Sequence, residues 1–387
     1  MFRKIKEITF KLSPYCNLKC EYCFQKDLIK EDKEIFDKYD DLIYFIRTIS
    51  IDDQLQFKLT GGETSLICDQ IEIAYKKLKK IERYVPTRVF FTTITNGTNL
   101  EGIINLMSRG ILESSGCKLS WDGIYSASRS RKPKNIDIYS DEFFNNKVKL
   151  LGKSKFRNKM LVRIAITPNT ISSLSDSVLF LLENGCTKFE YYYLTDCEEY
   201  RDVNFINEFK RQLEKISILY TKYDFDYYNW NTIYFAEKLI EDSDKIKSIN
   251  CRHLGKSLYI NMNGYISPCG FFSDDCVFDQ CKLYIGDLKN GLYRKEVEGF
   301  INEYSEAPMC NYKKCNNMQC FECPATNKHR TGRMNNKLYQ CCELRTIEKN
   351  IFLNNIDVFK KKSTEIEKEF HYFKDFHREN LTPDYIK

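Results

Sequence analysis

The sequence has few of the features that mark a histidine-based site, a membrane protein or an exported protein. Only four of its 387 residues are histidine, and they are scattered. No stretch approaches the roughly 20 consecutive apolar residues that cross a bilayer. Residues 1–7 also lack the apolar core of a secretory signal peptide. We therefore predict a cytoplasmic protein with no membrane partner.

Charge is not concentrated either. The 60 lysines and arginines exceed the 54 aspartates and glutamates by six, an excess that could attract an acidic partner or simply keep the protein soluble. No basic block alternates with aromatic residues, so we predict no nucleic-acid partner. The composition, 42% apolar and 29% charged, is typical of a globular protein. The length favours two domains.

Cysteine, by contrast, is abundant. There are seventeen, and most lie between Cys251 and Cys342. In a reducing compartment clustered cysteines favour metal binding over disulfides. The first three, Cys16, Cys20 and Cys23, follow the apolar run 8–12 with the spacing C-x3-C-x2-C. Three thiolates can hold three irons of a cubane cluster and leave the fourth iron open, and an open coordination position is typical of a catalytic metal centre.

Short strands and helices alternate over residues 7 to about 222. Strands rich in β-branched and aromatic residues are predicted, and they cover 7–12, 55–60, 88–95, 117–121, 160–166 and 189–194. Helices between them are predicted at 33–49, 70–83, 100–108, 141–151, 172–183 and 203–220, and a short further one at 232–240. Six strand-then-helix units in a row indicate a parallel sheet with outer helices.

The cysteine spacing, its position after the first strand and the aromatic residues beside Cys23 resemble the radical S-adenosylmethionine (radical SAM) superfamily. The resemblance implies an α/β fold, a partial (β/α)6 TIM-type barrel with its active site at the carboxyl ends of the strands. It also implies a [4Fe-4S] cluster on Cys16, Cys20 and Cys23 whose open iron binds S-adenosylmethionine. A zinc knuckle lacking its fourth ligand is the alternative interpretation.

The same resemblance assigns cofactor contacts. Gly61, Gly62 and Glu63 follow the second strand, where a glycine pair permits close backbone approach and the carboxylate would bind the cofactor's ammonium. A plain glycine turn is the alternative. Tyr22 and Phe24 flank the last cysteine and would contact the adenine.

Two further contacts follow later strands. Ser120, before Asp122-Gly123, would reach the ribose, helped by Arg129 or Arg131. Asn96 ends the third strand and is either a cofactor contact or part of a turn. Arg163 on the fifth strand points either into the mouth of the barrel or to solvent.

The C-terminal cysteines resemble the SPASM domain, which carries two auxiliary iron–sulfur clusters. Asn263-Gly264 between alternating apolar residues predicts a hairpin before Cys269. By analogy Cys251, Cys269 and Cys323 bind the first auxiliary cluster, with Cys276, Cys281 or no residue as fourth ligand. The second cluster would then use Cys310, Cys315, Cys320 and Cys341, where Cys342 could replace Cys341. Two zinc sites are the alternative.

We therefore predict a radical SAM core at 1–225, a bridge at 226–248, a SPASM domain at 249–345 and a helical tail at 346–387. The predicted function is a radical SAM/SPASM oxidoreductase that modifies a peptide or protein side chain and receives electrons from a reductant such as flavodoxin or ferredoxin. Oxidation of a sulfatase-type serine or cysteine, or of a small molecule, is the enzymatic alternative. A zinc-binding interaction protein is the alternative outside catalysis.

Two departures from the family bear on these alternatives. Sulfatase-maturing enzymes place an aspartate directly after the hairpin cysteine, where this chain has Gly270. Asp274 and Asp275 follow, out of register, which disfavours the sulfatase-type reaction. The winged-helix domain that grips a leader peptide in many peptide maturases has no room before Cys16.

Overall fold

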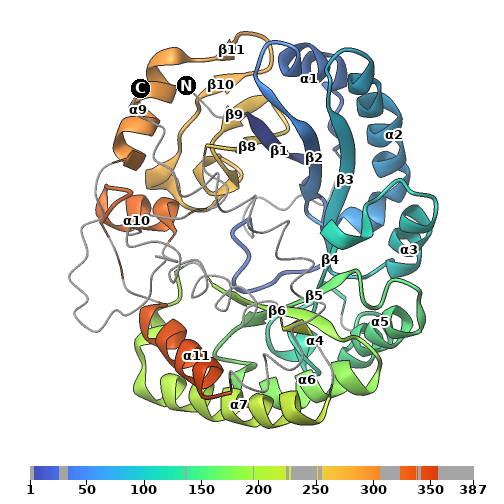
Figure 1. Ribbon diagram of the computed structural model, residues 1–387, viewed down its shortest axis with the longest axis vertical. Helices are drawn as coiled ribbons and strands as arrows, with labels where there is room; N and C mark the ends of the chain where they lie inside the picture. The colour runs from blue at the N-terminus through green and yellow to red at the C-terminus, as the bar shows by residue number, and fades with distance from the viewer. Residues whose placement is uncertain are drawn as a thin grey trace.

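The computed structural model describes residues 4–25, 34–135, 137–194, 196–223, 226–227, 255–305, 323–336 and 341–355, together with residues 251 and 338. In these residues one sheet has the strand order β11-β10-β9-β8-β1-β2-β3-β4-β5-β6-β7. Figure 1 shows this sheet curving into a partial ring, with α2, α3, α5, α6 and α7 on the outside. Strands β1 to β7 are mutually parallel, as predicted for a partial barrel.

The strands of the parallel part are β1 (Ile5–Ser13), β2 (Ile51–Gly61), β3 (Arg88–Thr95), β4 (Lys118–Ser120), β5 (Leu161–Ile166), β6 (Lys188–Tyr193) and β7 (Asp226–Tyr227). The later strands are β8 (Ser257–Ile260), β9 (Tyr265–Ser267), β10 (Gly286–Asp287) and β11 (Gly291–Leu292). The six predicted strands correspond to β1 to β6. The bridge adds the short strand β7, which the sequence analysis did not predict.

The helices of the barrel part are α1 (Tyr39–Ile46), α2 (Cys68–Leu78), α3 (Leu100–Ser108), α4 (Ser126–Arg129), α5 (Asp141–Lys153), α6 (Leu174–Glu183) and α7 (Val203–Lys222). The C-terminal part contains α9 (Arg294–Ser305), α10 (Pro324–Thr331) and α11 (Cys342–Asn354). Short 3-10 turns lie at Thr64–Ile67, Lys79–Arg83, Ser114–Gly116, Ile171–Ser173, Glu198–Arg201, Gly270–Phe272 and Asp279–Cys281. The predicted helix 232–240 and the tail beyond residue 355 lie outside the described residues.

The strands form where they do because their alternate side chains face a packed layer. Phe10, Phe57 and Phe91 stand on neighbouring strands and pack in a row, with ring centroids 6.1 Å and 5.4 Å apart. Tyr75 of α2 meets Phe91 edge-on. This layer buries the outer face of β1 to β3 and leaves their other face for the interior of the ring.

Capping residues explain several helix boundaries. Asn99, Ser140 and Asp202 each accept a hydrogen bond from a backbone amide in the first turn of α3, α5 and α7, which satisfies donors that the helix itself cannot. Gly110 and Gly185 adopt positive φ after α3 and α6, as predicted for helix ends. Two helices are shorter than predicted: α1 spans only Tyr39–Ile46, and α2 ends at Leu78 and continues as a 3-10 turn.

The predicted hairpin forms at β8 and β9, and Gly264 in its turn has a φ of +87°. The sequence did not indicate where this hairpin would dock. Strand β8 pairs parallel with β1, through Glu7 to Phe10 opposite Ser257 to Ile260. The cysteine-rich region therefore continues the sheet of the barrel, on the edge of β1 opposite β2.

Helix α11 is joined to the far side of the barrel. It packs on α7, as Figure 1 shows, and its fully buried Glu348 accepts a 2.8 Å hydrogen bond from the Tyr193 hydroxyl of β6. The Arg345 guanidinium pairs with Glu348 at 3.3 Å and lies over the Tyr193 ring. A buried carboxylate with these partners is satisfied, so the chain after Cys341 is fastened to β6.

Candidate functional site

Cys16, Cys20 and Cys23 lie on the loop that leaves the carboxyl end of β1. Cys16 and Cys20 are buried, Cys23 is half-buried, and none of the three forms a disulfide within the described residues. The Cys16 sulfur accepts a hydrogen bond from the Leu18 amide at 3.4 Å, and the Cys23 amide donates to the Cys20 carbonyl at 3.1 Å. The loop thus brings three thiols to one end of the sheet.

The surroundings of these thiols disfavour bare thiolates. Burial and then the charge of Glu63 raise the pKa of Cys16 to about 12. Burial raises the pKa of Cys20 to about 12 against the opposing charge of Arg131. Each pKa is also raised by Cys23, so the three sulfurs are near enough to repel one another when charged. Such a donor set becomes stable when cationic irons bind it, and it fits a three-thiolate cluster.

The described residues contain no group of three His, Cys, Asp or Glu side chains that could hold a metal ion. Ligands of a single ion must converge on one atom, whereas a cubane offers a separate iron to each thiolate. A three-thiolate cluster and a zinc knuckle thus place different demands on the positions of these thiols.

Gly61 and Gly62 hold the start of this loop against β2. The Gly62 amide donates to the Ser13 carbonyl at 2.8 Å, and the Glu63 amide donates to the Tyr15 carbonyl at 2.7 Å. A Cβ on Gly61 would lie 2.1 Å from the Ser13 oxygen, and one on Gly62 would lie 2.0 Å from the Tyr15 oxygen. Only glycine allows so close an approach, so these two residues position the cysteine loop.

The Glu63 carboxylate is buried beneath the same loop. Its Oε1 accepts hydrogen bonds from the Ser65 amide at 2.9 Å and the Thr95 hydroxyl at 2.5 Å. Its Oε2 accepts one from the Asn96 amide at 2.6 Å. A carboxylate can accept about four hydrogen bonds, so Oε2 keeps one position for a further donor, which suits an ammonium group.

The side chain of Asn96 is used to hold the cysteine loop. Its amide nitrogen donates to Asn17 Oδ1 at 3.1 Å, and its Oδ1 accepts from the Thr98 amide and hydroxyl at 2.9 and 2.6 Å. Asn17 in turn donates to the Thr98 hydroxyl at 2.9 Å. This closed network ties the loop after β1 to the loop after β3.

Tyr22 connects the cysteine loop to the end of β4. Its hydroxyl donates to Asp122 Oδ2 and accepts from the Arg131 guanidinium at 2.7 Å. Buried Asp122 also accepts from the Ser130 hydroxyl at 2.9 Å and the Ala165 amide at 3.1 Å. Burial raises the pKa of Tyr22 well above its usual value, so the phenol stays protonated and keeps this connection.

The network distinguishes between the two arginines predicted near Ser120. The guanidinium of Arg131 lies 3.6 Å from Asp122, and its charge lowers the pKa of Cys20. Arg129 instead stacks on the Tyr125 ring at 4.2 Å. Arg131 therefore belongs with the cysteine loop, and Arg129 does not.

Ser120 and Arg163 are paired in register on β4 and β5. The Ser120 hydroxyl is half-buried and makes no hydrogen bond within the described part of the chain, so it is available to a ligand. Arg163 points to the inner face, where its Nε lies 2.5 Å from Glu190. Phe24, by contrast, contacts the C-terminal region: its ring packs 4.9 Å from Phe271, and its carbonyl accepts from the Val277 amide.

Three of the predicted auxiliary ligands come together. Burial and then the charges of Cys251 and Cys323 raise the pKa of Cys269, so these three thiols are neighbours although the chain separates them widely. Cys341 precedes α11 and lies close enough to Tyr193 and Tyr200 to raise their pKa values after burial. The remaining predicted ligands, Cys310, Cys315 and Cys320, lie outside the described residues.

The two candidates for a fourth ligand differ in their surroundings. The Cys281 thiol donates to the carbonyls of Phe271 and Phe278 at 3.1 and 3.3 Å. Cys276 and Cys281 both lie near Cys323, whose charge adds to burial in raising each pKa to about 12, so the hydrogen bonds are what distinguish them. Cys281 would lose two hydrogen bonds on binding iron, so the geometry favours Cys276.

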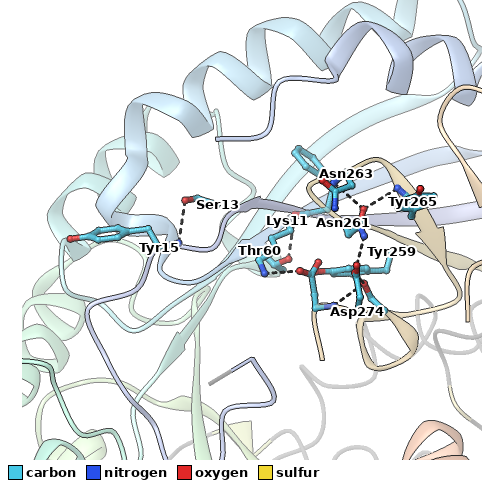
Figure 2. A network of polar contacts seen from close by, with 12 residues as sticks. Lys11, Ser13, Tyr15, Thr60, Tyr259, Asn261, Asn263, Tyr265 and Asp274 are labelled. Atoms are coloured by element: carbon cyan, nitrogen blue, oxygen red, sulfur yellow. Dashed lines mark hydrogen bonds and ion pairs between the residues drawn. The ribbon is translucent and has the colours of Figure 1, made fainter. Parts of the chain in front are cut away.

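A further group of polar residues lies where β1 meets the hairpin β8–β9. The sequence analysis did not predict it. The buried Lys11 ammonium pairs with Asp275 at 2.7 Å, and the Tyr259 hydroxyl donates to the other oxygen of Asp275 at 2.8 Å. Figure 2 shows Lys11 and Tyr259 beside Asn261 and Asp274, which are joined by a 2.8 Å hydrogen bond. An apolar run containing one lysine did not indicate that β8 would dock there and bring an aspartate to it.

Comparison with known proteins identifies the N-terminal region. Residues 10–114 match the profile of the radical SAM superfamily. The chain therefore carries a radical SAM region. The match includes the three cysteines and Gly61-Gly62-Glu63, and it confirms the resemblance inferred from the sequence. The family implies a [4Fe-4S] cluster and S-adenosylmethionine.

Solved structures confirm the fold. One described as native anSMEcpe with bound AdoMet is 17% identical, with a TM-score of 0.67, and the match covers 92% of this chain and 99% of that one. The same protein with AdoMet and the Cp18Cys peptide gives 16% identity, the same coverages and a TM-score of 0.65. SuiB from Streptococcus suis bound to S-adenosylmethionine is 14% identical over 70% of this chain and 61% of that one, with a TM-score of 0.47. No curated protein sequence matches.

At this identity the likeness to anSMEcpe concerns the fold, and it extends through the C-terminal part of the chain. Among the described helices none is both long enough and apolar enough to span a membrane. The family match is limited to residues 10–114, and these comparisons identify neither the substrate nor the reaction.

Proposed function

We propose that this protein is a radical SAM/SPASM oxidoreductase that modifies a side chain of a peptide or protein. The observation that carries the proposal is the three-cysteine loop fastened at several points to the ends of the parallel strands, by Gly62, Asn96 and Asp122. Each contact comes from a different strand end, so the loop position depends on the whole barrel.

In this proposal Cys16, Cys20 and Cys23 hold the cluster. Glu63, Ser120 and Arg131 would meet the ammonium and ribose of S-adenosylmethionine, and Tyr22 and Phe24 would line the adenine. When bound, the cluster and cofactor would supply a 5′-deoxyadenosyl radical by one-electron reduction, with flavodoxin or ferredoxin as the reductant. The chain's own residues orient these groups and keep water away from them.

The auxiliary clusters are part of the same proposal. Cys251, Cys269 and Cys323, with Cys276 as the fourth ligand, would hold the first, and Cys310, Cys315, Cys320 and Cys341 the second. The docking of β8 on β1 supports this arrangement, because it brings the hairpin and its Cys269 to the barrel that carries the cysteine loop. A peptide substrate is supported by the matched anSMEcpe structure that contains a peptide.

The net change we propose removes two hydrogens from the substrate. One leaves as a hydrogen atom and ends in 5′-deoxyadenosine. The other leaves as a proton, while its electron goes to a one-electron acceptor of the iron–sulfur class. A new bond forms between the two substrate atoms, as in a thioether or carbon–carbon cross-link, and the product is about two daltons lighter than the substrate by this balance.

The test begins with anaerobically reconstituted protein. It should be brown, contain about twelve irons per chain if three cubanes are present, and form 5′-deoxyadenosine when a reductant and S-adenosylmethionine are added. Coexpression with short open reading frames beside the gene, followed by mass spectrometry, then tests for the two-dalton loss. Colourless protein loaded with zinc would overturn the proposal. Conversion of a sulfatase-type serine or cysteine to an aldehyde, with the corresponding mass change but no cross-link, would replace it with the alternative reaction.

A further inference from the structure

A group of charged side chains on the inner face of the sheet takes no part in the candidate cofactor and cluster contacts described above. It consists of Lys118 on β4, Arg163 on β5 and Glu190 on β6. The alternate residues Leu119, Val162 and Phe189 are fully buried toward the helices. Because successive side chains of a strand point to opposite faces, the charged three share the inner face. The side chains of Lys118 and Arg163 are 24% and 23% exposed, so a ligand can reach them.

The internal ion pairs use only part of this group. Both cations bind the same carboxylate oxygen, Glu190 Oε1, at 2.9 Å from Lys118 Nζ and 2.5 Å from Arg163 Nε. The two Nη groups of Arg163 make no hydrogen bond to any residue that the structure describes. They form the planar fork that binds a carboxylate through two parallel hydrogen bonds.

A third cation lies beside them. Lys58 on β2 is half-buried, and within the described ranges its ammonium has no ion-pair partner. It is near enough to contribute, after burial and Arg163, to lowering the pKa of Lys118 to about 8. The group therefore contains three cations and one carboxylate, and only Lys118 and Arg163 bind that carboxylate. Lys11, the next lysine on this face, is already paired with Asp275.

The group lies next to the candidate cofactor residues. Arg163 is paired in register with Ser120. Two residues further along β5, the Ala165 amide donates to Asp122, which binds Tyr22 of the cysteine loop. Excess positive charge on a partly exposed inner surface attracts anions, and here it is placed beside the position where the radical would form.

We propose that Arg163 and Lys58, assisted by Lys118, bind a carboxylate of the substrate and thereby hold the residue to be modified. This inference rests on the proposed function. The carboxylate could belong to an aspartate or glutamate side chain or to a free peptide C-terminus, because both present the same planar group. The cations would orient the peptide and take no part in the bond changes.

The test uses three short probes and anaerobically reconstituted enzyme, with binding measured by equilibrium dialysis. One probe is acetyl-Gly-Glu-Gly amide, the second is acetyl-Gly-Gln-Gly amide, and the third is acetyl-Gly-Gln-Gly with a free C-terminus. Each is measured with and without S-adenosylmethionine. We expect the enzyme to bind the first or the third probe about tenfold or more tightly than the second, as for a hydrogen-bonded charge pair. The stronger of the two identifies the source of the carboxylate.

Four variants then locate the binding site. Arg163→Gln should remove the preference, and Lys58→Gln should weaken it severalfold without breaking any ion pair of the described fold. Arg211→Gln is the control, because it removes the same charge from an exposed pair on α7 and should leave the preference unchanged. Glu190→Gln removes the internal competitor, so it should tighten binding of the carboxylate probe severalfold. A purely structural role for Glu190 predicts no such gain.

Equal binding of all three probes by the wild type would overturn the proposal, as would an unchanged preference in Lys58→Gln and Arg163→Gln. A preference that disappears when S-adenosylmethionine is bound would also overturn it, because the cations would then serve the cofactor's own carboxylate. The proposed function is judged separately by 5′-deoxyadenosine formation. If the protein cleaves the cofactor but binds all three probes equally, the proposed function stands and the carboxylate site is rejected.

Discussion

The two groups of cysteines in this protein are assembled in opposite ways. Cys16, Cys20 and Cys23 come from one loop of eight residues, and the rest of the barrel serves to position that loop. Cys251, Cys269 and Cys323 come from three separate segments, before β8, after β9 and before α10, so their proximity depends on the tertiary fold. The thiols of the first group are already close in the chain, and the fold only has to position them. The thiols of the second group come near one another only when the tertiary structure has formed.

This contrast separates local from long-range determinants of a metal site. Short spacing restricts the distance between thiols whatever the rest of the chain does. Residues far apart in the chain meet only after the loop between them is closed, which costs conformational entropy that packing must offset. Mutations in the fold should therefore displace the first group as a unit but separate the members of the second.

The largest expected effect is the loss of one thiol from the cysteine loop. Cys20→Ala should abolish 5′-deoxyadenosine formation and remove about four irons per chain, while the other irons remain. Iron analysis and chromatography of the reaction measure both quantities. Cys117→Ala is the control, since Cys117 is also a fully buried thiol but lies outside both groups. If Cys20→Ala still cleaves the cofactor, the ligand assignment is wrong.

Placement of the loop is tested by Gly62→Ala. Its methyl group would lie 2.0 Å from the Tyr15 carbonyl oxygen, so the loop must move, at a cost of about 1–3 kcal/mol in unfolding free energy. The rate of cofactor cleavage should fall by at least the same factor as the folding equilibrium constant. Gly299→Ala in α9 meets nothing within 4 Å and should stabilise by roughly 0.5–1 kcal/mol. Equal thermal shifts in the two variants would contradict this account of the glycine pair.

The second cysteine group should respond differently. Cys269→Ala should reduce product formation much more than cofactor cleavage, because it leaves the first loop intact. Between the two fourth-ligand candidates, Cys276→Ser should lower the iron content and Cys281→Ser should not. Iron analysis together with electron paramagnetic resonance of the reduced protein checks this. Iron loss in Cys281→Ser alone would reverse the assignment of the fourth ligand.

A smaller effect is expected where the loop meets β4. Tyr22→Phe removes the hydroxyl that donates to Asp122 and accepts from Arg131, while Asp122 keeps Ser130 and Ala165 as donors. We expect destabilisation of about 1–2 kcal/mol and a raised KM for S-adenosylmethionine. Arg129→Gln is the matched comparison and should change neither quantity. An equal rise in KM from Arg129→Gln would show that the wrong arginine was chosen.

The smallest effect concerns acid stability. Burial opposes ionisation of Glu190, but Arg163 and Lys118 outweigh it and lower the pKa of this carboxyl from 4.5 to about 2. Because the folded-state pKa is depressed, the ion pairs contribute stability that is full above about pH 4.5 and is lost as the pH falls toward 2. Glu190→Gln should flatten that part of the stability profile in denaturant titrations. If the stability of Glu190→Gln varied with pH in parallel with that of the wild type, these ion pairs would contribute nothing to the free energy of unfolding.

Much of the molecule followed from local sequence. The strands β1 to β6 and the glycine ends of α3 and α6 were predictable because apolar periodicity and turn residues act over a few positions. The radical SAM region was recognisable from the spacing of Cys16, Cys20 and Cys23, since that spacing alone restricts how three thiols can be arranged.

The contacts between distant segments could be seen only in the tertiary structure. The docking of β8 on β1, the contact of Arg131 with Tyr22 and the meeting of Lys118, Arg163 and Glu190 each join segments that are distant in the chain. Such contacts join residues far apart in the chain, so they depend on how the strands pair and which faces are buried, and the local pattern alone does not determine them. A local pattern thus determines the resemblance to the radical SAM superfamily, whereas the fold determines which side chains surround the cysteine loop.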